Sequence, residues 1–172
     1  MASKEVEMTR VGELMDLETE FWRSEGVGEV YERLMTDDAT HTVFVKAHIW
    51  RTGHLLLLKR RPDDDLYPDL WDIPGGRLDR NESARAGLAR EIAEETGLIL
   101  QSCRPLTVWD FDNQGTRALG LSFLATCNEA APRISGEHEK LAWMAPQDLD
   151  RFPMAPNLQQ EIAWIISKGW HR

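Results

Sequence analysis

The sequence predicts an α/β fold in which a mixed β-sheet is sandwiched between α-helices. Two runs rich in β-branched and aromatic residues, 42–50 and 54–60, predict strands. The stretch 83–96 contains no proline and is rich in Ala, Glu, Arg and Leu, which predicts a helix. Further strand-like runs and a closing helix follow it, at 99–100, 106–111, 118–126, 141–144 and 157–168. Strands on both sides of a helix in the chain indicate the mixed sheet.

The first 40 residues differ in pattern from the rest, so we expect 1–40 to be a helical extension of one domain at 41–172. An apolar stripe with roughly helical spacing, interrupted by Gly26 and Gly28, predicts one or two amphipathic helices. Packing against the domain is the favoured role of this extension. Two alternatives stay open: a substrate-binding element, and a homodimer contact through Phe21, Trp22 and Tyr31.

The two strands before the central helix are expected to form a hairpin. Thr52 and Gly53 fit the turn between them. The run 54–60 is apolar on both faces, so we expect it at the centre of the sheet. The histidines in this region are too scattered to be metal ligands and are expected to be structural or on the surface: His41, His48 and His54.

Composition limits the classes of partner. The chain has 172 residues and a formal net charge of −9, which argues against nucleic acid and membrane-surface partners because both need basic surface. A small phosphorylated substrate remains compatible, since it can enter as a metal complex. Cys103 and Cys127 lack the spacing of a zinc pair or a redox motif, so both are expected to be reduced and buried. Without a membrane-length apolar run or a signal peptide, the expected location is the cytoplasm.

The central helix has clear start and stop signals. Asn81 or Ser83 can cap its start, and Gly97 follows its last residue, where a left-handed residue commonly ends a helix. Its apolar residues fall mostly on one face and are expected to pack against the sheet: Leu88, Ala89, Ile92 and Ala93.

Three carboxylates share another face of this helix. Glu94 and Glu95 follow Glu91 by three and four residues, so each lies within roughly 60° of it around the axis. A solvated acidic stripe is the ordinary explanation for such a charge run. The alternative is a hard divalent cation, Mg²⁺ or Mn²⁺, which prefers carboxylate oxygens and is often shared with substrate phosphates.

A longer pattern around these glutamates favours the cation. The stretch from Gly76 to Leu98 resembles the Nudix hydrolase signature G-x5-E-x7-R-E-U-x-E-E-x-G-U, where U is a bulky apolar residue. Every fixed position matches: Gly76, Glu82, Arg90, Glu91, Ile92, Glu94, Glu95, Gly97 and Leu98. At ordinary residue frequencies, a chance match at a given start has a probability of about 10⁻⁹. The resemblance implies the Nudix fold, a mixed sheet between helices.

The resemblance also implies roles for the box residues. Glu91, Glu94 and Glu95 are expected to hold one to three Mg²⁺ ions, which polarise a water for attack on phosphorus. A carbonyl of the glycine pair at the start of the box, Gly75 or Gly76, is expected to face the metal, and Gly76 is the one assigned. Arg90 is expected to orient a box carboxylate, because its guanidinium is fork-shaped and always charged.

Residues outside the box are candidates for substrate contact. Arg60 and Arg61 could meet phosphates, with a basic strand end as the alternative. Tyr67 and Trp71 could stack on a base, although packing beneath the loop is the favoured role of Trp71. In the family, an acid before a late strand often supplies another metal ligand or the general base. Glu137 and Glu139 are the two acids in that position, and Glu139 is the one assigned as a metal ligand.

The expected reaction is Mg²⁺-dependent hydrolysis of a nucleoside diphosphate linked to another group. A nucleoside triphosphate giving a nucleoside monophosphate and pyrophosphate is the favoured substrate, and ADP-ribose or a nucleotide sugar is the nearest alternative. An isopentenyl-diphosphate isomerase is disfavoured, since that enzyme needs a cysteine upstream of its box and both cysteines here lie downstream. A non-catalytic nucleotide-binding domain is disfavoured because all box carboxylates are present.

Overall fold

The computed structural model describes residues 42–64, 67–113 and 116–172. Residues 42–172 belong to one compact unit. The predicted extension at 1–40, with its aromatic dimer contact, lies outside the described residues and stays a prediction. Within the described part of the chain, no helix has both the length and the apolar character needed to cross a membrane.

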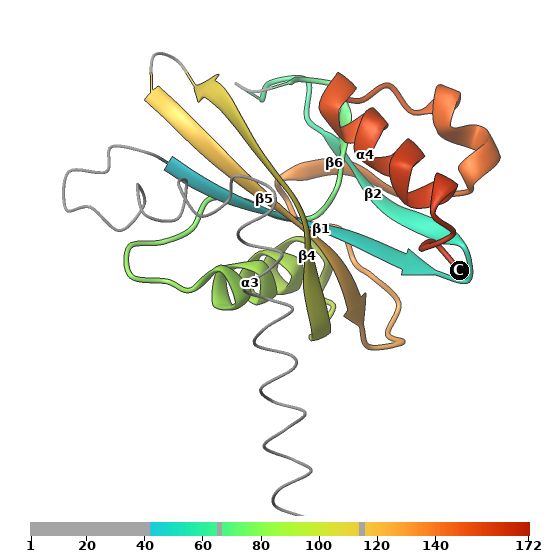
Figure 1. Ribbon diagram of the computed structural model, residues 1–172, viewed down its shortest axis with the longest axis horizontal. Coiled ribbons are helices and arrows are strands. Elements are labelled where there is room, and N and C mark those ends of the chain that lie inside the picture. Colours follow the sequence, from blue (N-terminus) through green and yellow to red (C-terminus); the bar gives the residue numbers. More distant parts are fainter. Residues whose placement is uncertain (1–41, 65–66, 114–115) are drawn as a thin grey trace, which may run out of the picture. The chain divides into compact units, whose positions relative to one another are not determined.

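Six strands form a mixed sheet in the order β3-β2-β1-β5-β4, with β6 also paired to β2 (Figure 1). Their bounds are β1 Thr42–Arg51, β2 His54–Arg60, β3 Trp71–Asp72, β4 Leu100–Asn113, β5 Thr116–Cys127 and β6 His138–Met144. The β1–β5 pair is parallel, and the other pairs are antiparallel. The predicted hairpin of β1 and β2 is therefore confirmed, and the long parallel β1–β5 pair makes the sheet mixed.

One strand prediction needs correction. The runs 99–100 and 106–111 were expected as two strands, but the structure has a single strand, β4, from Leu100 to Asn113. Pro105 lies inside it, and the pairing with β5 shifts register between Pro105 and Thr107. β4 is at the edge of the sheet, where a residue without an amide proton costs little, so the strand continues past the proline.

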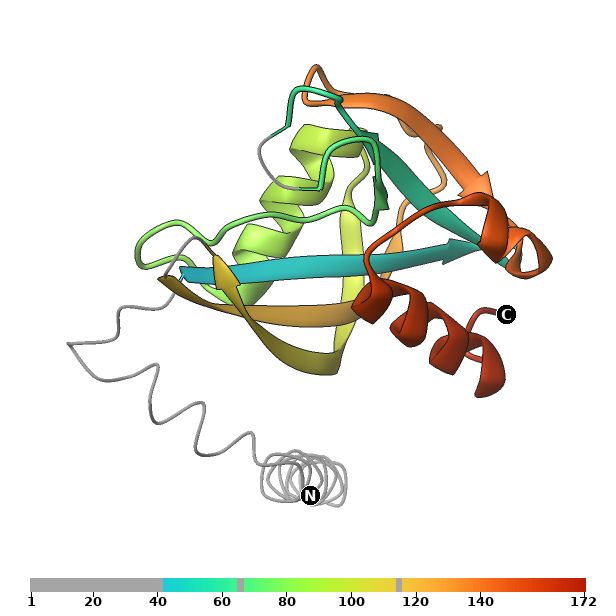
Figure 2. The same ribbon diagram turned by 90° about the horizontal axis from the view of Figure 1, so that it is seen from above.

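Two helices cover opposite faces of the sheet. α3 (Ala84–Thr96) lies on one side of β1 and α4 (Pro156–Ser167) on the other, as Figure 2 shows. A short 3₁₀ helix, η1 (Pro146–Arg151), precedes α4. The expected layers, helix, sheet and helix, are confirmed.

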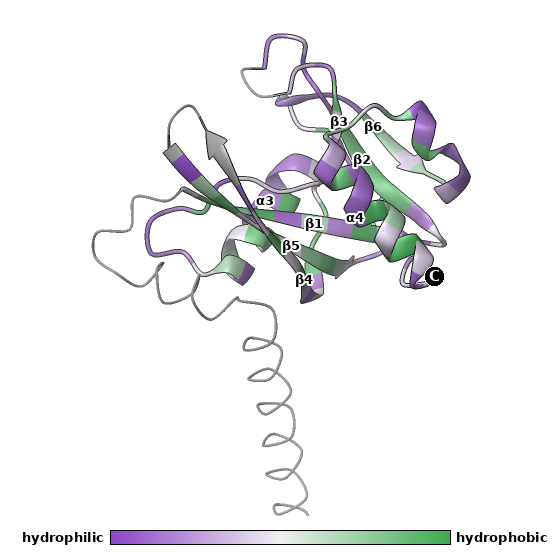
Figure 3. Ribbon diagram, turned by 45° about the horizontal axis from the view of Figure 1, so that its top comes forward, coloured by the Kyte–Doolittle hydropathy of each residue, from purple (hydrophilic) through white to green (hydrophobic). Residues whose placement is uncertain are grey.

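Each face of the sheet has its own core. Leu88 and Ile92 of α3 pack with Leu56 of β2, whereas Leu158 and Ile162 of α4 pack with Leu55 and Leu57 of the same strand. Successive residues of a strand point to opposite faces, so β2 contributes to both cores. All four leucines of β2 are fully buried, and the strand is apolar along most of its length in Figure 3. Its predicted central position is confirmed.

The ends of α3 follow the expected signals. The Ser83 hydroxyl accepts a hydrogen bond from the Ala86 amide at 3.2 Å, and Gly97 adopts the left-handed conformation with a φ of 68°. Ser83, rather than Asn81, is therefore the cap. One prediction for the apolar face is wrong: Ala93 is exposed, because it follows Ile92 by about 100° around the helix and points away from the sheet.

Candidate active site

The carboxylate of Glu95 is buried where α3 meets the loop between β3 and the helix. Glu95 is 6% exposed, and its Oε2 accepts a hydrogen bond from the Gly75 amide at 2.7 Å. Gly75 has a φ of +135°, and a Cβ there would lie 2.0 Å from the Val45 carbonyl oxygen. Only glycine fits this position, and it brings the amide to the carboxylate of Glu95.

Burial governs the ionisation of Glu95 and of its neighbour on β6. It raises the pKa of Glu95 to about 8, so this carboxyl group is largely protonated at neutral pH when no cation is bound. The His138 Nε2 lies 3.6 Å from Glu95 Oε1, which is too long for a hydrogen bond. Burial lowers the pKa of His138 to about 4, so the imidazole is neutral and does not balance the charge of Glu95.

Arg90 connects the other carboxylates of the box. Its Nε and Nη2 donate to Glu82 at 3.1 and 2.9 Å, and its Nη1 donates to Glu91 at 2.8 Å and to Glu94 at 3.1 Å. Nη2 also donates to the Arg77 carbonyl at 3.0 Å. The hydrogen bonds to Glu82 come first among the contacts that raise the pKa of Arg90, so the guanidinium stays charged. One side chain thus donates hydrogen bonds to three carboxylates, and its Nε also lies 3.7 Å from Asp79 Oδ2.

The three glutamates of the acidic face are not equivalent. Glu94 is exposed, Glu91 is half-buried and Glu95 is buried. Across residues 42–64, 67–113 and 116–172, no three His, Cys, Asp or Glu side chains converge on one point as a preformed metal cage. The three carboxylates therefore range from solvent-exposed to buried along this face of α3.

Two of these carboxylates have the chemistry that a divalent cation requires. Burial raises the pKa of Glu95, and it raises that of Glu91 in spite of the ion pair with Arg90, so a cation would stabilise the ionised form of both carboxyl groups. A Cβ at Gly76 would lie 2.6 Å from the Glu91 carboxyl group, so the missing side chain leaves room for that group beside the loop. The donor set is all oxygen, which suits Mg²⁺ or Mn²⁺.

Lys46 of β1 occupies the other side of the same loop. Its Nζ donates to Asp72 Oδ2 at 2.7 Å, to the Gly75 carbonyl at 2.9 Å and to the Ile73 carbonyl at 3.3 Å. Burial pushes the pKa of Asp72 upward, but the charge and hydrogen bond of Lys46, the Ile73 amide and the charge of Arg60 together outweigh it, and the net pKa is lowered. The Gly76 carbonyl, expected to face a metal, accepts a hydrogen bond from the Val45 amide at 2.9 Å.

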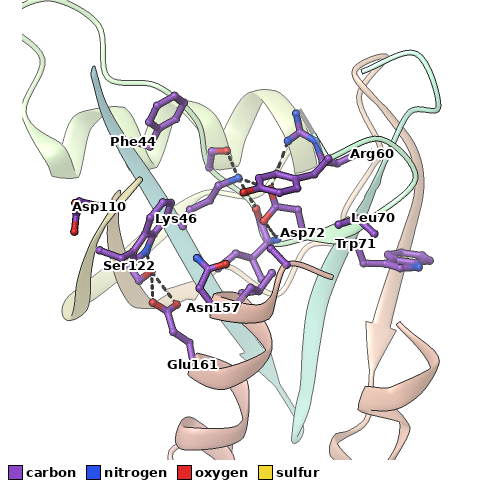
Figure 4. A pocket seen from close by; sticks show the side chains of 16 residues that line it. Phe44, Lys46, Arg60, Leu70, Trp71, Asp72, Asp110, Ser122, Asn157 and Glu161 are labelled. Atoms are coloured by element: carbon purple, nitrogen blue, oxygen red, sulfur yellow. Dashed lines mark hydrogen bonds and ion pairs between the residues drawn. The ribbon is translucent and has the colours of Figure 1, made fainter. Parts of the chain in front are cut away.

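A cavity of about 290 Å³ opens from this loop toward α4. Figure 4 shows Lys46 and Asp72 at one end of it, and Ser122 and Glu161 at the other. Its lining also includes aromatic and apolar side chains: Phe44, Tyr67, Leu70, Trp109 and Leu158. A concave, mostly apolar pocket with a few polar groups beside the box is the natural place for a small ligand.

The expected substrate contacts divide into two groups. Arg60 and the exposed Tyr67 line the pocket, and Arg60 also donates to Asp64 at 2.7 Å. Trp71 contributes to the lining, but its indole points away from the centre of the cavity in Figure 4 and packs edge-on against Phe152 at 5.0 Å. The Arg61 side chain is exposed, pairs with Asp63 and is not part of the lining.

The acids expected near β6 are not the groups that reach Glu95. The Lys59 Nζ donates to Glu139 at 2.7 Å, and Glu137 is exposed in the preceding turn. Successive residues of β6 point to opposite faces, and it is His138 that lies beside Glu95. The structure does not bring Glu139 to Glu95.

Sequence reasoning missed several residues of the site. Lys46 is the only Lys, Arg, Asp or Glu in the strand-like run 42–50, and Glu161 is the only acid in the closing helix. A lone charge in an apolar strand was therefore the available signal for Lys46, and a lone acid in the closing helix was the signal for Glu161. Ser122 and His138 gave no comparable signal, since their roles depend on which strands become neighbours.

Comparison with known proteins agrees with this geometry. The NUDIX domain family matches residues 40–165. The CTP pyrophosphohydrolase of Escherichia coli (strain K12) is 30% identical over 117 residues, covering 65% of this chain and 82% of that protein. Nucleoside triphosphatase NudI of Escherichia fergusonii is 32% identical over 117 residues, covering 62% and 83%. A crystal structure of a MutT NUDIX hydrolase from Burkholderia pseudomallei has a TM-score of 0.62 and 30% identity, covering 71% of this chain and 95% of that one.

A mixed sheet between two helices, with a complete box that runs from the loop before α3 to the end of that helix, is the arrangement of a hydrolase of phosphate anhydrides. This chain belongs to the Nudix hydrolase family, whose domain matches most of its length. The resemblance, the Nudix fold and the assignment as an enzyme are thereby confirmed. Nudix enzymes act on small nucleotide derivatives and generally use divalent cations, so the small-molecule partner that the resemblance implies is confirmed at that level. The exclusion of nucleic acid and membrane partners stays a prediction.

Proposed function

We propose that this enzyme hydrolyses a nucleoside triphosphate to a nucleoside monophosphate and pyrophosphate. The observation that carries most weight is the buried carboxyl group of Glu95, which lies beside Glu91 and accepts a hydrogen bond from Gly75 at one end of the 290 Å³ pocket. The two curated relatives described above are named as a nucleoside triphosphatase and a CTP pyrophosphohydrolase, which supports a triphosphate substrate. The substrate is a free nucleotide, in keeping with the net charge of −9.

The residues proposed to hold Mg²⁺, or Mn²⁺, are Glu91, Glu94 and Glu95, with a backbone carbonyl of the glycine pair. When bound, the cation neutralises the diphosphate and lowers the pKa of a coordinated water. Of the two carbonyls, that of Gly75 lies beside the Lys46 ammonium and that of Gly76 accepts from Val45. Each carbonyl oxygen has a second lone pair available to a metal. Glu139 stays a weaker candidate for a metal ligand, since its carboxylate already accepts a hydrogen bond from Lys59.

Two box residues have roles that follow from their contacts. Arg90 orients Glu91 and Glu94 through its Nη1, so it is proposed as a positioning group that does not touch substrate. Glu91 is proposed as the group that accepts the proton of the attacking water. Burial raises its pKa, which brings a carboxylate closer to the pH at which a general base works well.

Basic groups at the pocket would receive the phosphates. Lys46 and Arg60 both line the cavity, and each is already oriented by an ion pair with Asp72. Tyr67 lies at the exposed rim, where an aromatic face can stack on a base. Positioning and charge neutralisation then supply most of the acceleration, as in other phosphoryl transfers.

A hydrolysis screen with Mg²⁺ tests the substrate class. The panel contains ribonucleoside and deoxyribonucleoside triphosphates, oxidised purine triphosphates, ADP-ribose, nucleotide sugars and dinucleoside polyphosphates. Glu129 is 88% exposed at its side chain and far from the box in the chain, so Glu129→Gln serves as the matched control for Glu95→Gln. We expect triphosphates to be turned over by the wild type and the control. Faster turnover of ADP-ribose or a nucleotide sugar would contradict the proposed substrate.

A further inference from the structure

Five side chains from four elements form a polar cluster at the end of the pocket away from the box. The carboxylate of Glu161 on α4 accepts hydrogen bonds from His48 Nε2 at 2.9 Å, from Ser122 Oγ at 2.9 Å and from Thr107 Oγ1. Trp109 Nε1 donates to the Ser122 oxygen at 3.0 Å. This cluster lies outside the box and has no part in the mechanism above.

The hydrogen bonds within the cluster use most of the acceptor sites of the Glu161 carboxylate. A carboxylate offers about four acceptor sites and donates nothing when ionised. Three donors from β1, β4 and β5 contact the carboxylate, and Ser122 Oγ also lies 3.2 Å from Glu161 Oε1, while the side chain remains 12% exposed and lines the pocket. Burial favours the neutral form, but the bonds from His48, Thr107 and Ser122 and the charge of His48 together outweigh it and lower the pKa of Glu161. The end of the pocket therefore presents an ionised, partly exposed acceptor.

The sheet beside this carboxylate presents an apolar surface with aromatic side chains. Phe44, Gly120 and Trp109 are register partners across β1, β5 and β4, so their positions form one row. A Cβ at Gly120 would lie 2.2 Å from the Trp109 ring, so the indole lies directly over the glycine. Ser122 follows Gly120 by two residues and faces the same side. Aromatic walls beside a polar end suit the faces and the edge of a planar base.

Asn157 supplies a second polar group on the same face of α4. It precedes Glu161 by one helical turn, and Figure 4 shows its amide directed toward the centre of the pocket. An amide both donates and accepts, whereas the Glu161 carboxylate only accepts. Together, the Glu161 carboxylate and the Asn157 amide are complementary to a base that carries a projecting N–H donor next to an acceptor. The carboxylate accepts from the N–H group, and the amide donates to the acceptor.

We propose that Glu161 reads an exocyclic amine of the nucleobase, so that the site takes cytosine, adenine or guanine and rejects uracil and thymine. The amines of the first three project beyond the ring and can reach a single recessed acceptor. Uracil and thymine carry only a ring N–H between two carbonyl oxygens, and a carboxylate repels those oxygens. This inference rests on the proposed function for the orientation of the nucleotide, and it deepens that function by naming the base class.

The test compares two nucleotides that differ at one edge. CMP and UMP binding is measured by calorimetry, and the kcat/KM values for CTP and UTP are measured in parallel, for the wild type, Glu161→Gln and the control Glu129→Gln. A hydrogen bond to a charged acceptor predicts a wild-type and control preference for cytidine of about 10- to 100-fold. The glutamine introduced by Glu161→Gln can turn its NH₂ toward the carbonyl of uracil, so the preference should fall to near unity or reverse.

A change in the ratio of CMP affinity to UMP affinity distinguishes base recognition by Glu161 from a simple loss of stability. If Glu161 only supports the fold, Glu161→Gln weakens both nucleotides equally, the ratio stays constant and the proposal is overturned. A wild type without preference for CMP overturns it too. As a test that needs no variant, the monophosphate of the 2-pyrimidinone riboside, which lacks only the amine, should bind the wild type at least about tenfold more weakly than CMP. Selective CMP binding without any hydrolysis would support this inference and contradict the proposed function.

Discussion

Glu95→Gln should make the metal-free enzyme more stable at alkaline pH while removing its activity. Glutamine has nearly the same shape as glutamate, and its Oε1 can still accept the hydrogen bond from the Gly75 amide. What changes is the ionisable group, because the wild-type carboxyl group is 6% exposed and must lose a proton in an unfavourable environment.

The magnitude follows from the pKa of Glu95, which burial raises from 4.5 to about 8. A folded-state pKa above the unfolded one gives stability that is fully present below pH 4.5 and is lost as pH rises to 8. At 1.36 kcal/mol per pH unit, the wild type loses about 3 kcal/mol by pH 7 and about 5 kcal/mol by pH 9. Glutamine does not titrate, so the variant should be more stable by these amounts, with a difference near zero at pH 4.5.

Urea unfolding in EDTA, followed by tryptophan fluorescence at pH 5, 7 and 9, measures this difference. The neighbouring His138 titrates in both proteins, so its contribution cancels in the comparison. Adding Mg²⁺ should stabilise the wild type more than the variant, since the cation binds the ionised carboxylate. Equal stability of the two proteins at pH 9 would refute the reasoning, because it would mean that Glu95 is ionised without strain in the free enzyme.

Three further perturbations address the same site. At pH 7, Mg²⁺ binding to the wild type should release close to one proton, detected by calorimetry in buffers of different ionisation enthalpy, and Glu95→Gln should release clearly fewer, since only Glu91 keeps a raised pKa. Arg90→Lys should lower kcat about 10- to 100-fold in the same hydrolysis assay, because a lysine cannot bridge Glu82 and Glu91 together; near-normal turnover would contradict the positioning role. Gly120→Ala should displace the Trp109 indole, weaken nucleotide binding at least about tenfold and shift tryptophan fluorescence, whereas unchanged binding would show that the indole forms no wall of the nucleotide site.

The parts of the fold that local chemistry determines were predictable from the sequence. α3 was expected at 83–96 and spans Ala84–Thr96, because its cap, its helix-forming composition and its terminal glycine all act within a few residues. β2 was expected at 54–60 and matches, since four consecutive leucines can only be buried in a central strand. β4 was predicted in two pieces, because tolerance of Pro105 depends on the edge position, which local sequence does not encode.

The box glutamates were found because their spacing lies within one helix, whereas the far end of the pocket was not found. Glu161, His48, Ser122 and Thr107 lie on four elements and become neighbours only through the parallel β1–β5 pairing and the packing of α4. For a similar reason, the sequence does not show that His138, and not the adjacent Glu139, lies beside Glu95. Choosing between them requires the register of β6 against β2, because successive residues point to opposite faces.

The central claim is cleavage of a nucleoside triphosphate by the box carboxylates with Mg²⁺. Phosphorus NMR of a reaction with CTP tests it most directly, because the spectrum identifies every product. We predict CMP and pyrophosphate in equal amounts, formed only with Mg²⁺ or Mn²⁺, and a loss of at least about 10²-fold in rate for Glu95→Gln. Formation of CDP and phosphate, or an unchanged rate in the variant, would contradict the account.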